Sequence, residues 1–238
     1  MAKYKVLSTK KLDRSLVDQA AQNGIDIIER EFISIQPKSP AEIKQAIDEL
    51  SDRKNLCVAF TSANAVDSLA SYSTEGSFGN WKIFCLAGKT KERLEAAGLG
   101  KNIVGVANNA AQLAENIIER RVDHIIFFCG DRRRDELPDK LREANVKVVE
   151  VVLYETIDTP STISDKLDGI LFFSPSGVES FFSLNRLSGD VLCFAIGATT
   201  AAAIAGCTNN SVAVCSVPDS KAMVEKVIEH FEEKSAVN

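Results

Sequence analysis

The sequence has few of the residues on which metal and nucleophilic sites usually depend. Its only histidines are His124 and His230, so a zinc site and a Ser–His catalytic pair are both poorly supported. No GxGxxG motif follows a strand-like run, and neither a P-loop nor an HExxH pattern is present. His124 opens an apolar run and His230 falls in the last helical stretch, so we expect both to be structural.

The sequence also has no excess of positive charge. The net charge of −5 and the pI of about 5.3 argue against nucleic acid and anionic membranes as partners, but not against a small polyanionic ligand. No apolar run approaches the ~18 residues of a membrane span, and the start MAKYKVLSTKK has no apolar signal region. None of the six cysteines forms a CxxC pair, and most fall in strand-like runs, which favours a reducing cytosol.

What the sequence does contain is an alternation of short apolar runs and longer amphipathic stretches. Continuous apolar strands with intervening helices predict parallel sheets that are covered on both faces, an α/β fold. The expected strands are Tyr4–Leu7, Leu56–Phe60, Lys82–Leu86, Ile103–Val106, His124–Phe128, Val146–Leu153, Ile170–Phe173, Val191–Ile196 and Val212–Cys215.

The chain also repeats itself. The segment FTSANAV at 60–66 resembles FFSPSGV at 172–178, and later positions match at a similar spacing of roughly 110 residues, a normal domain size. Two segments closing in proline, EFISIQPKSP and VLYETIDTP, fit neither copy. We therefore expect two similar domains: residues 1–31 with 160–238, and an inserted domain 38–152, joined by linkers 32–37 and 153–159.

Small polar residues follow most of the predicted strands and start helices. A helix N-terminus offers free N–H groups and a partial positive charge, so several of them could hold a ligand with many carboxylates. Plain helix capping is the alternative at each position. The candidate residues are Thr61, Ser62, Ala63, Asn64, Thr90, Ser174, Ser176, Gly177, Thr199 and Thr200.

Two further features have open interpretations. Arg132 leads a run of three arginines at a predicted helix start, where it either binds an anionic ligand or belongs to a solvated charge run with neighbouring carboxylates. Tyr154 lies in the second linker, where its phenol either faces a ligand or packs as a linker aromatic.

Five motifs, taken in order, resemble the uroporphyrinogen-III synthase family over nearly the whole chain. They are FTSANAV, GDRRRDELPDKL with the strand leading into VLYET, FFSPSGVESFF, AIGATTAAAI and SVPDSKAM. In the first copy the expected glycine-led turn reads LAGKT, with Gly88 shifted by one position.

The resemblance implies two α/β domains joined by a two-stranded linker, with the active site in the cleft between them. It implies a lyase of tetrapyrrole and heme biosynthesis that cyclises hydroxymethylbilane to uroporphyrinogen III with loss of water and inversion of the last pyrrole ring. It also implies that neither a metal nor an organic cofactor is used. The family's linker tyrosine falls on Tyr154, its glycine-led threonine on Thr199 or Thr200, and its strand-end hydroxyls on Thr61, Ser62, Ser174 and Ser176. We expect Tyr154 to assist departure of the hydroxyl group and backbone N–H groups to hold the substrate.

A cytosolic two-domain protein that binds a small polyanion without catalysis is the alternative reading. The absence of an export signal in the sequence makes this alternative the less favoured one. We further expect a monomer in the cytoplasm that receives its substrate from the preceding pathway enzyme.

Overall fold

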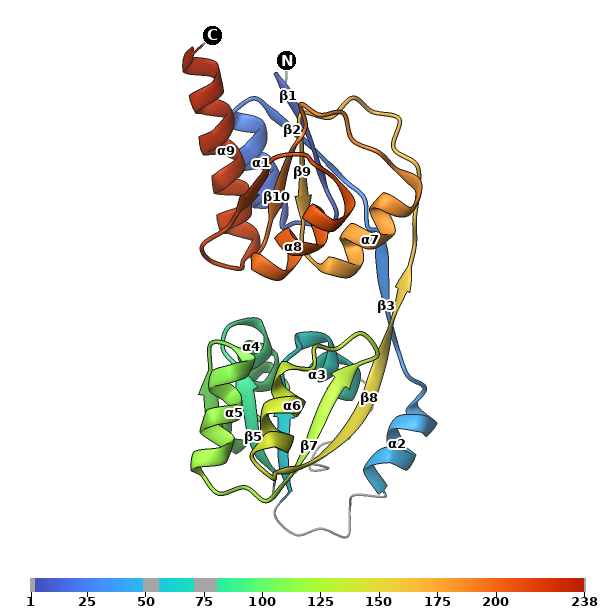
Figure 1. The fold of residues 1–238 in the computed structure, drawn as a ribbon, viewed down its shortest axis with the longest axis vertical. Coiled ribbons are helices and arrows are strands. Elements are labelled where there is room, and N and C mark those ends of the chain that lie inside the picture. The colour runs from blue at the N-terminus through green and yellow to red at the C-terminus, as the bar shows by residue number, and fades with distance from the viewer. Residues whose placement is uncertain (1–2, 49–55, 71–80, 238) are drawn as a thin grey trace. The chain divides into compact units, whose positions relative to one another are not determined.

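The computed structural model describes residues 3–48, 56–70 and 81–237. The chain divides into two compact units: unit 1 comprises Met1–Ser34 with Ile157–Asn238, and unit 2 comprises Ile35–Thr156. The chain passes from unit 1 to unit 2 in strand β3 and returns in strand β8, as Figure 1 shows.

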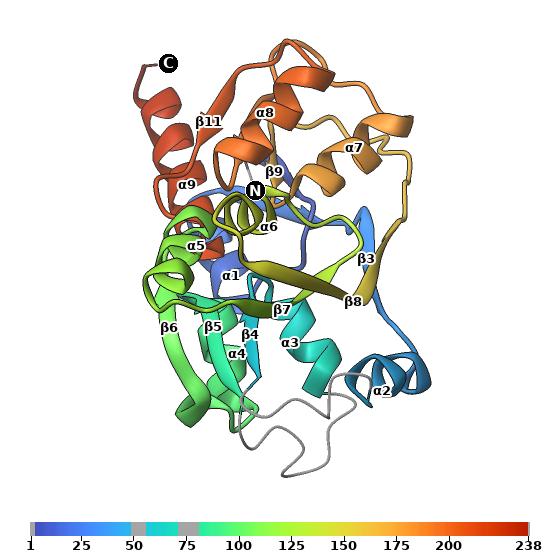
Figure 2. The ribbon, with the colours of Figure 1, turned by 60° about the horizontal axis from the view of Figure 1, so that its bottom comes forward.

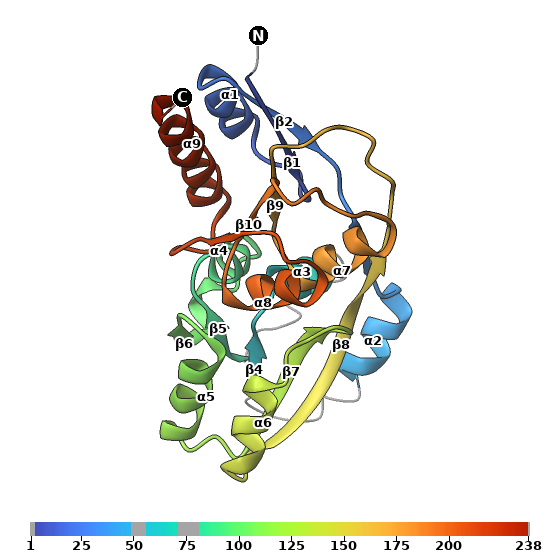
Figure 3. The ribbon, with the colours of Figure 1, turned by 45° about the horizontal axis from the view of Figure 1, so that its top comes forward.

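Unit 1 is a parallel five-stranded sheet in the order β11-β10-β9-β1-β2. Its strands are β1 (Tyr4–Ser8), β2 (Ile25–Glu29), β9 (Gly169–Phe172), β10 (Leu192–Ala195) and β11 (Val212–Val214). Its helices are α1 (Arg14–Gln22), α7 (Pro175–Leu184), α8 (Ala198–Cys207) and α9 (Ser220–Val237). Side chains of α1 and α9 pack on one face of the sheet and those of α7 and α8 on the other, and Figure 3 shows each pair side by side.

Unit 2 is a six-stranded sheet in the order β3-β8-β7-β4-β5-β6, which fans out in Figure 2. Its strands are β3 (Ile33–Pro37), β4 (Cys57–Phe60), β5 (Lys82–Leu86), β6 (Ile103–Ala107), β7 (His124–Gly130) and β8 (Lys147–Asp158). Its helices are α2 (Pro40–Asp48), α3 (Ala63–Ala70), α4 (Lys89–Ala96), α5 (Ala110–Glu119) and α6 (Glu136–Glu143), with the 3-10 turn η1 (Gly100–Asn102). Helices α2, α3 and α4 pack on one face of the sheet and α5 and α6 on the other.

The two sheets have the same order of equivalent strands. Strands β9, β10 and β11 follow β4, β5 and β6 by about 110 residues, the size of an ordinary domain. The remaining pair, β7 and β8, corresponds to β1 and β2 from the start of the chain. Unit 1 thus repeats the strand order of unit 2 from β6 to β8, and β1 and β2 from the start of the chain take the places of β7 and β8. The predicted fold class, two similar α/β domains with parallel sheets flanked by helices, is confirmed.

Local sequence explains where the helices start. Ser174 is the N-cap of α7, where its Oγ accepts the Gly177 N–H at 3.1 Å, and Pro175 follows at the first helical position. Asn109 caps α5 in the same way by accepting the Gln112 N–H at 2.9 Å. Within the described part of the chain, no helix combines the length and the apolar character needed to cross a bilayer.

Candidate functional site

In each sheet there is one pair of neighbouring strands from which the chain continues in opposite directions along the sheet, a topological switch point. In unit 2 this switch point lies between β4 and β7, and in unit 1 between β9 and β1. Ligands of open parallel sheets bind beyond the carboxyl ends of the strands at such points. Residues that directly follow these four strands are therefore the first candidates for a binding site.

At the unit 2 switch point, Tyr154 of β8 meets the residues that follow β4. Its phenol oxygen lies 3.0 Å from Ser62 Oγ, a hydrogen bond between residues 92 positions apart in sequence. The ring is packed in the core of unit 2 with 9% of its surface exposed, whereas Ser62 is half-buried. Tyr154 is thus a packed aromatic whose hydroxyl reaches the switch point.

An irregularity in the sheet places Tyr154 there. The pairing of β7 with β8 shifts between Cys129 and Gly130, so that Cys129 lies opposite Val152 and Gly130 opposite Tyr154. The extra residue, Leu153, is fully buried and the next residue, Tyr154, is largely buried, which breaks the alternation of buried and exposed side chains along β8. Such bulges re-aim side chains next to active sites.

The environment keeps the phenol protonated. Burial raises the pKa of Tyr154 above its ordinary value of 10, and hydrogen bonds from Ser62 and Asn64 oppose that rise in part. The group can therefore donate a hydrogen bond or a proton at neutral pH. Thr61, Ser62, Ala63 and Asn64 lie between the end of β4 and the first turn of α3, and all four are half-buried.

The second arginine of the run after β7 takes part in a network of ion pairs. Arg133 is ion-paired with Glu150 and Asp135, and Arg142 shares the same Glu150 carboxylate. Arg133 thus belongs to a structural network in which Glu150, a partner not expected from the sequence, bridges β8 and α6. Arg132 lies two residues beyond the end of β7 and is exposed at the switch point. Its binding of an anionic ligand stays a prediction.

At the unit 1 switch point, Ser174 and the first turn of α7, which follow β9, lie beside the end of β1. Thr9 follows β1 and is 6% exposed, and its hydroxyl donates to the Leu171 carbonyl at 2.8 Å. The Ser174 hydroxyl accepts the Gly177 N–H and so caps the helix. Ser176 makes no described capping bond, so it is the serine of this helix start that we expect to contact a ligand.

Sequence reasoning missed the residues after β1. Lys10 lies two residues beyond this strand, as Arg132 does beyond the equivalent β7, and its ammonium sits 5.8 Å from the Phe173 ring centre. The segment Ser8-Thr9-Lys10 after an apolar run was visible in the sequence, but it became a candidate only once β1 was known to lie next to β9.

The threonines predicted at the glycine-led turns differ in exposure. Thr90 and Thr200, equivalent positions in the two copies, are 6% and 1% exposed, so both side chains pack inside their units. Thr199 is exposed and is the member of the pair Thr199 and Thr200 that faces outward. The shifted Gly88 has a φ of 69°, a conformation that favours glycine, and this explains why the first-copy turn differs from the second.

Three buried cysteines and His230 are poorly suited to act as nucleophiles. Burial raises the pKa of the Cys85 and Cys129 thiols to about 11 and that of Cys193 to about 12, so these thiols are protonated at neutral pH. His230 packs against the Phe231 ring at 5.0 Å between centres. Among residues 3–48, 56–70 and 81–237, no group of three or more His, Cys, Asp or Glu side chains is placed to hold a metal ion.

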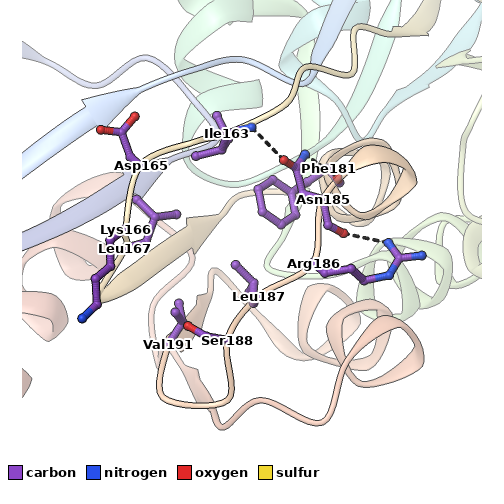
Figure 4. Close-up of a pocket in the computed structure, with 10 residues that line it drawn as sticks. All are labelled: Ile163, Asp165, Lys166, Leu167, Phe181, Asn185, Arg186, Leu187, Ser188 and Val191. Atoms are coloured by element: carbon purple, nitrogen blue, oxygen red, sulfur yellow. Dashed lines mark hydrogen bonds between the residues drawn. The ribbon is translucent and has the colours of Figure 1, made fainter.

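A separate hollow of about 220 Å³ lies in unit 1, and Figure 4 shows it. Apart from Phe181 of α7, its lining residues precede β9 and β10 or follow α7, so it opens at the amino ends of the strands, away from the switch point. Asn185 closes its rim by accepting the Ile163 N–H at 2.8 Å. None of the predicted site residues lines it.

Comparison with known proteins identifies the family. The model of the family described as uroporphyrinogen-III synthase HemD matches residues 14–225. The chain belongs to the uroporphyrinogen-III synthase family. Its membership confirms the enzyme class predicted from the sequence, a lyase of tetrapyrrole and heme biosynthesis.

Solved structures of uroporphyrinogen-III synthases have the same fold. One from the thermophilic bacterium Thermus thermophilus has a TM-score of 0.66 and 14% identity, and the match covers 99% of this chain and 100% of that one. One from Helicobacter pylori has a TM-score of 0.66 and 15% identity, with 95% and 99% covered. No curated protein sequence matches significantly. At such low identity these likenesses establish the fold, and the residues of the site stay a prediction.

Proposed function

We propose that this protein cyclises hydroxymethylbilane to uroporphyrinogen III, and that the switch-point residues of its two sheets hold the substrate. The observation that carries the proposal is the hydrogen-bonded pair of Tyr154 and Ser62 beside the arginine run, in a chain of the uroporphyrinogen-III synthase family. The phenol is protonated, directed to a strand end, and surrounded by residues that can bind anions.

The substrate carries eight carboxylates on four pyrroles, so binding is mainly a matter of anion recognition and of holding one conformation. Helix starts provide N–H groups and positive potential without lysine. Ser62, Ser176 and Thr199 supply hydroxyls at three such starts, and Arg132 and Lys10 supply cations at the two switch points. Holding the reacting ends together is itself a large source of rate enhancement.

The chemical step needs one proton at one place. The hydroxymethyl oxygen accepts a proton and departs as water, which leaves an electrophilic azafulvenium cation. The substituted position of the last pyrrole attacks this carbon to give a spiro intermediate. The bond from that position to its original methylene bridge then breaks, and the bridge bonds to the unsubstituted position of the same ring, which loses its proton, so that the last ring is inverted and the proton is returned. In our proposal Tyr154 donates a hydrogen bond or a proton to the departing oxygen, and its raised pKa keeps that proton available.

The substrate is a water-soluble polycarboxylate, which fits the cytoplasm as the place of action. The monomeric state and the handover from the preceding enzyme remain predictions.

The test is to supply the protein with hydroxymethylbilane made in situ, stop the reaction by oxidation, and separate the porphyrin isomers. We expect mainly the type III isomer, in the presence and in the absence of a chelator. The type I isomer in the proportion of a protein-free blank would refute the proposal, and loss of activity with chelator would contradict the metal-free part of it.

A further inference from the structure

Gly130 and Asp131, at the end of β7, touch Tyr154 from its backbone to its hydroxyl, although neither has a role in the proposed chemistry. The sequence marked the GDRRR motif for its arginines. The contacts of its first two residues all lead to Tyr154 or to the strand that carries it.

Gly130 is the residue on which the phenol ring rests. A Cβ added to it would lie 2.5 Å from Tyr154 Cε2 and 2.7 Å from the phenol oxygen, closer than any real Cβ approaches a non-bonded atom. The two residues are also opposite each other in the sheet, immediately after the shift in register. Any side chain at position 130 must push the ring and its hydroxyl out of their present place.

Asp131 holds the backbone of β8 at Tyr154 and just beyond it. Its N–H donates to the Tyr154 carbonyl at 3.1 Å, and its Oδ1 accepts the Thr156 N–H at 2.8 Å. These two bonds hold β8 directly at Tyr154 and two residues beyond it. They also supply ladder bonds where the irregular register disturbs the normal pairing.

We propose that Gly130 and Asp131 are positioning residues that hold the Tyr154 phenol at Ser62: Gly130 leaves the space for the ring, and Asp131 clamps the strand that carries it. The catalytic part of this inference rests on the proposed function of Tyr154. The positioning part is independent of it and has its own readout.

The first experiment measures the ring of Tyr154 directly. The chain has only three tyrosines, so ring-labelled tyrosine gives a simple NMR spectrum in which Tyr154→Phe assigns the signal. In Gly130→Ala we expect the Tyr154 resonance to shift and its titration midpoint to move down toward 10, because a displaced phenol is less buried. We expect kcat for type III formation to fall by roughly tenfold or more, with KM changed less, since the substrate-binding groups remain.

Gly105→Ala is the matched control. A Cβ at Gly105 would lie 2.6 Å from Phe84 Cδ1, an equally severe clash in the same sheet, but on β6 at the opposite side of β4 from β8. It should lower the melting temperature to a similar extent and leave both the Tyr154 signal and kcat unchanged. If Gly105→Ala moves them as Gly130→Ala does, the effect is general destabilisation and the positioning role is refuted.

Asp131 provides a second pair of variants that is less demanding for folding, because this side chain is exposed. Asp131→Ala removes the acceptor for the Thr156 N–H, whereas Asp131→Asn keeps an oxygen there, and both remove the same charge. We expect Asp131→Ala to shift the Tyr154 signal and lower kcat. In Asp131→Asn we expect the signal to lie close to its wild-type position and most of kcat to be retained.

The outcomes separate the two claims. A Tyr154 signal unchanged in Gly130→Ala and in Asp131→Ala overturns the positioning role. A shifted signal with unchanged kcat supports the positioning role and refutes the acid role of Tyr154 under the proposed function.

Discussion

Replacing Tyr154 with phenylalanine removes one hydroxyl and leaves the packed ring in place. The hydroxyl forms a hydrogen bond with Ser62 at 3.0 Å and a further one with Asn64, and both partners are half-buried, so water can take the place of the lost hydroxyl. One such bond contributes about 0.5–1.5 kcal/mol to stability. At about 2–4 °C per kcal/mol for a chain of this size, the melting temperature of Tyr154→Phe should therefore fall by only about 1–6 °C.

The expected loss of activity is larger than the loss of stability. A lost neutral hydrogen bond to the substrate lowers the rate by about tenfold at most, whereas a lost general acid costs about 100-fold or more. If the phenol protonates the departing oxygen, Tyr154→Phe should lower kcat by about 100-fold with little change in KM. Ser62→Ala keeps the phenol and should stay within about tenfold of the wild type.

The pH dependence provides a second criterion. Burial raises the pKa of Tyr154 above 10, so its acid form persists through neutral pH and kcat should show no loss from this group until the pH exceeds about 10. The phenol has a higher pKa in the folded chain than in the unfolded chain. The free energy of unfolding is therefore unaffected by this group below about pH 10, and it decreases as the pH rises from there through the folded-state pKa.

The assay is the initial rate of type III formation, measured against substrate concentration and corrected for spontaneous type I closure, with a thermal melt of each variant. A folded Tyr154→Phe enzyme with kcat within about threefold of the wild type would show that the phenol is not the acid. A folded but inactive Ser62→Ala enzyme would instead move the chemistry to the serine.

Three further predictions concern stability. Burial alone would raise the pKa of Glu150, but its bonds to Arg133 and Arg142 outweigh burial and lower it. Glu150→Gln should therefore lower the free energy of unfolding by about 1–3 kcal/mol at pH 7. In urea unfolding at successively lower pH, the difference between variant and wild type should vanish as the wild-type carboxylate is protonated. A difference that stays constant with pH would refute the ion-pair explanation. Phe128→Ala removes a fully buried ring stacked on Trp81, so urea unfolding should give a loss of about 3–5 kcal/mol, and a loss below about 1 kcal/mol would contradict the described core. Ser174→Ala removes the cap of α7 and should cost about 0.5–2 kcal/mol; no change in thermal stability would argue that the cap is not formed.

The fold was predictable from the sequence because the signals are local and strong. Short, β-branched and aromatic apolar runs such as His124–Phe128 are typical of buried strands, and the small polar residues after them are typical of helix starts. The repeat of FTSANAV as FFSPSGV indicated the doubling of the fold. The shared strand order of the two units shows the physical basis of that repeat.

The details of the site were not predictable because they depend on pairing between distant segments. Tyr154 and Ser62 are 92 residues apart, and their contact needs both the order β8-β7-β4 and the shift in register at Gly130. No spacing rule in the sequence reveals a bulge. Lys10 was overlooked for the same reason, since its strand joins the second copy only in the folded sheet.

Exposure could not be read from residue type either. Thr199 and Thr200 are adjacent threonines at a helix start, and sequence alone left open which of them a ligand could reach. The structure buries Thr200 and exposes Thr199, because successive residues of a helix point in directions about 100° apart.

The central claim is that the substrate binds at the carboxyl ends of the strands rather than in the 220 Å³ hollow at their amino ends. Amide NMR of the labelled protein, titrated with uroporphyrinogen III under anaerobic conditions, tests it most directly. The account predicts shifts of the amides after β4 and β7, and after β1 and β9, with those from Ile163 to Leu167 unchanged. Shifts confined to the residues of the hollow would contradict it.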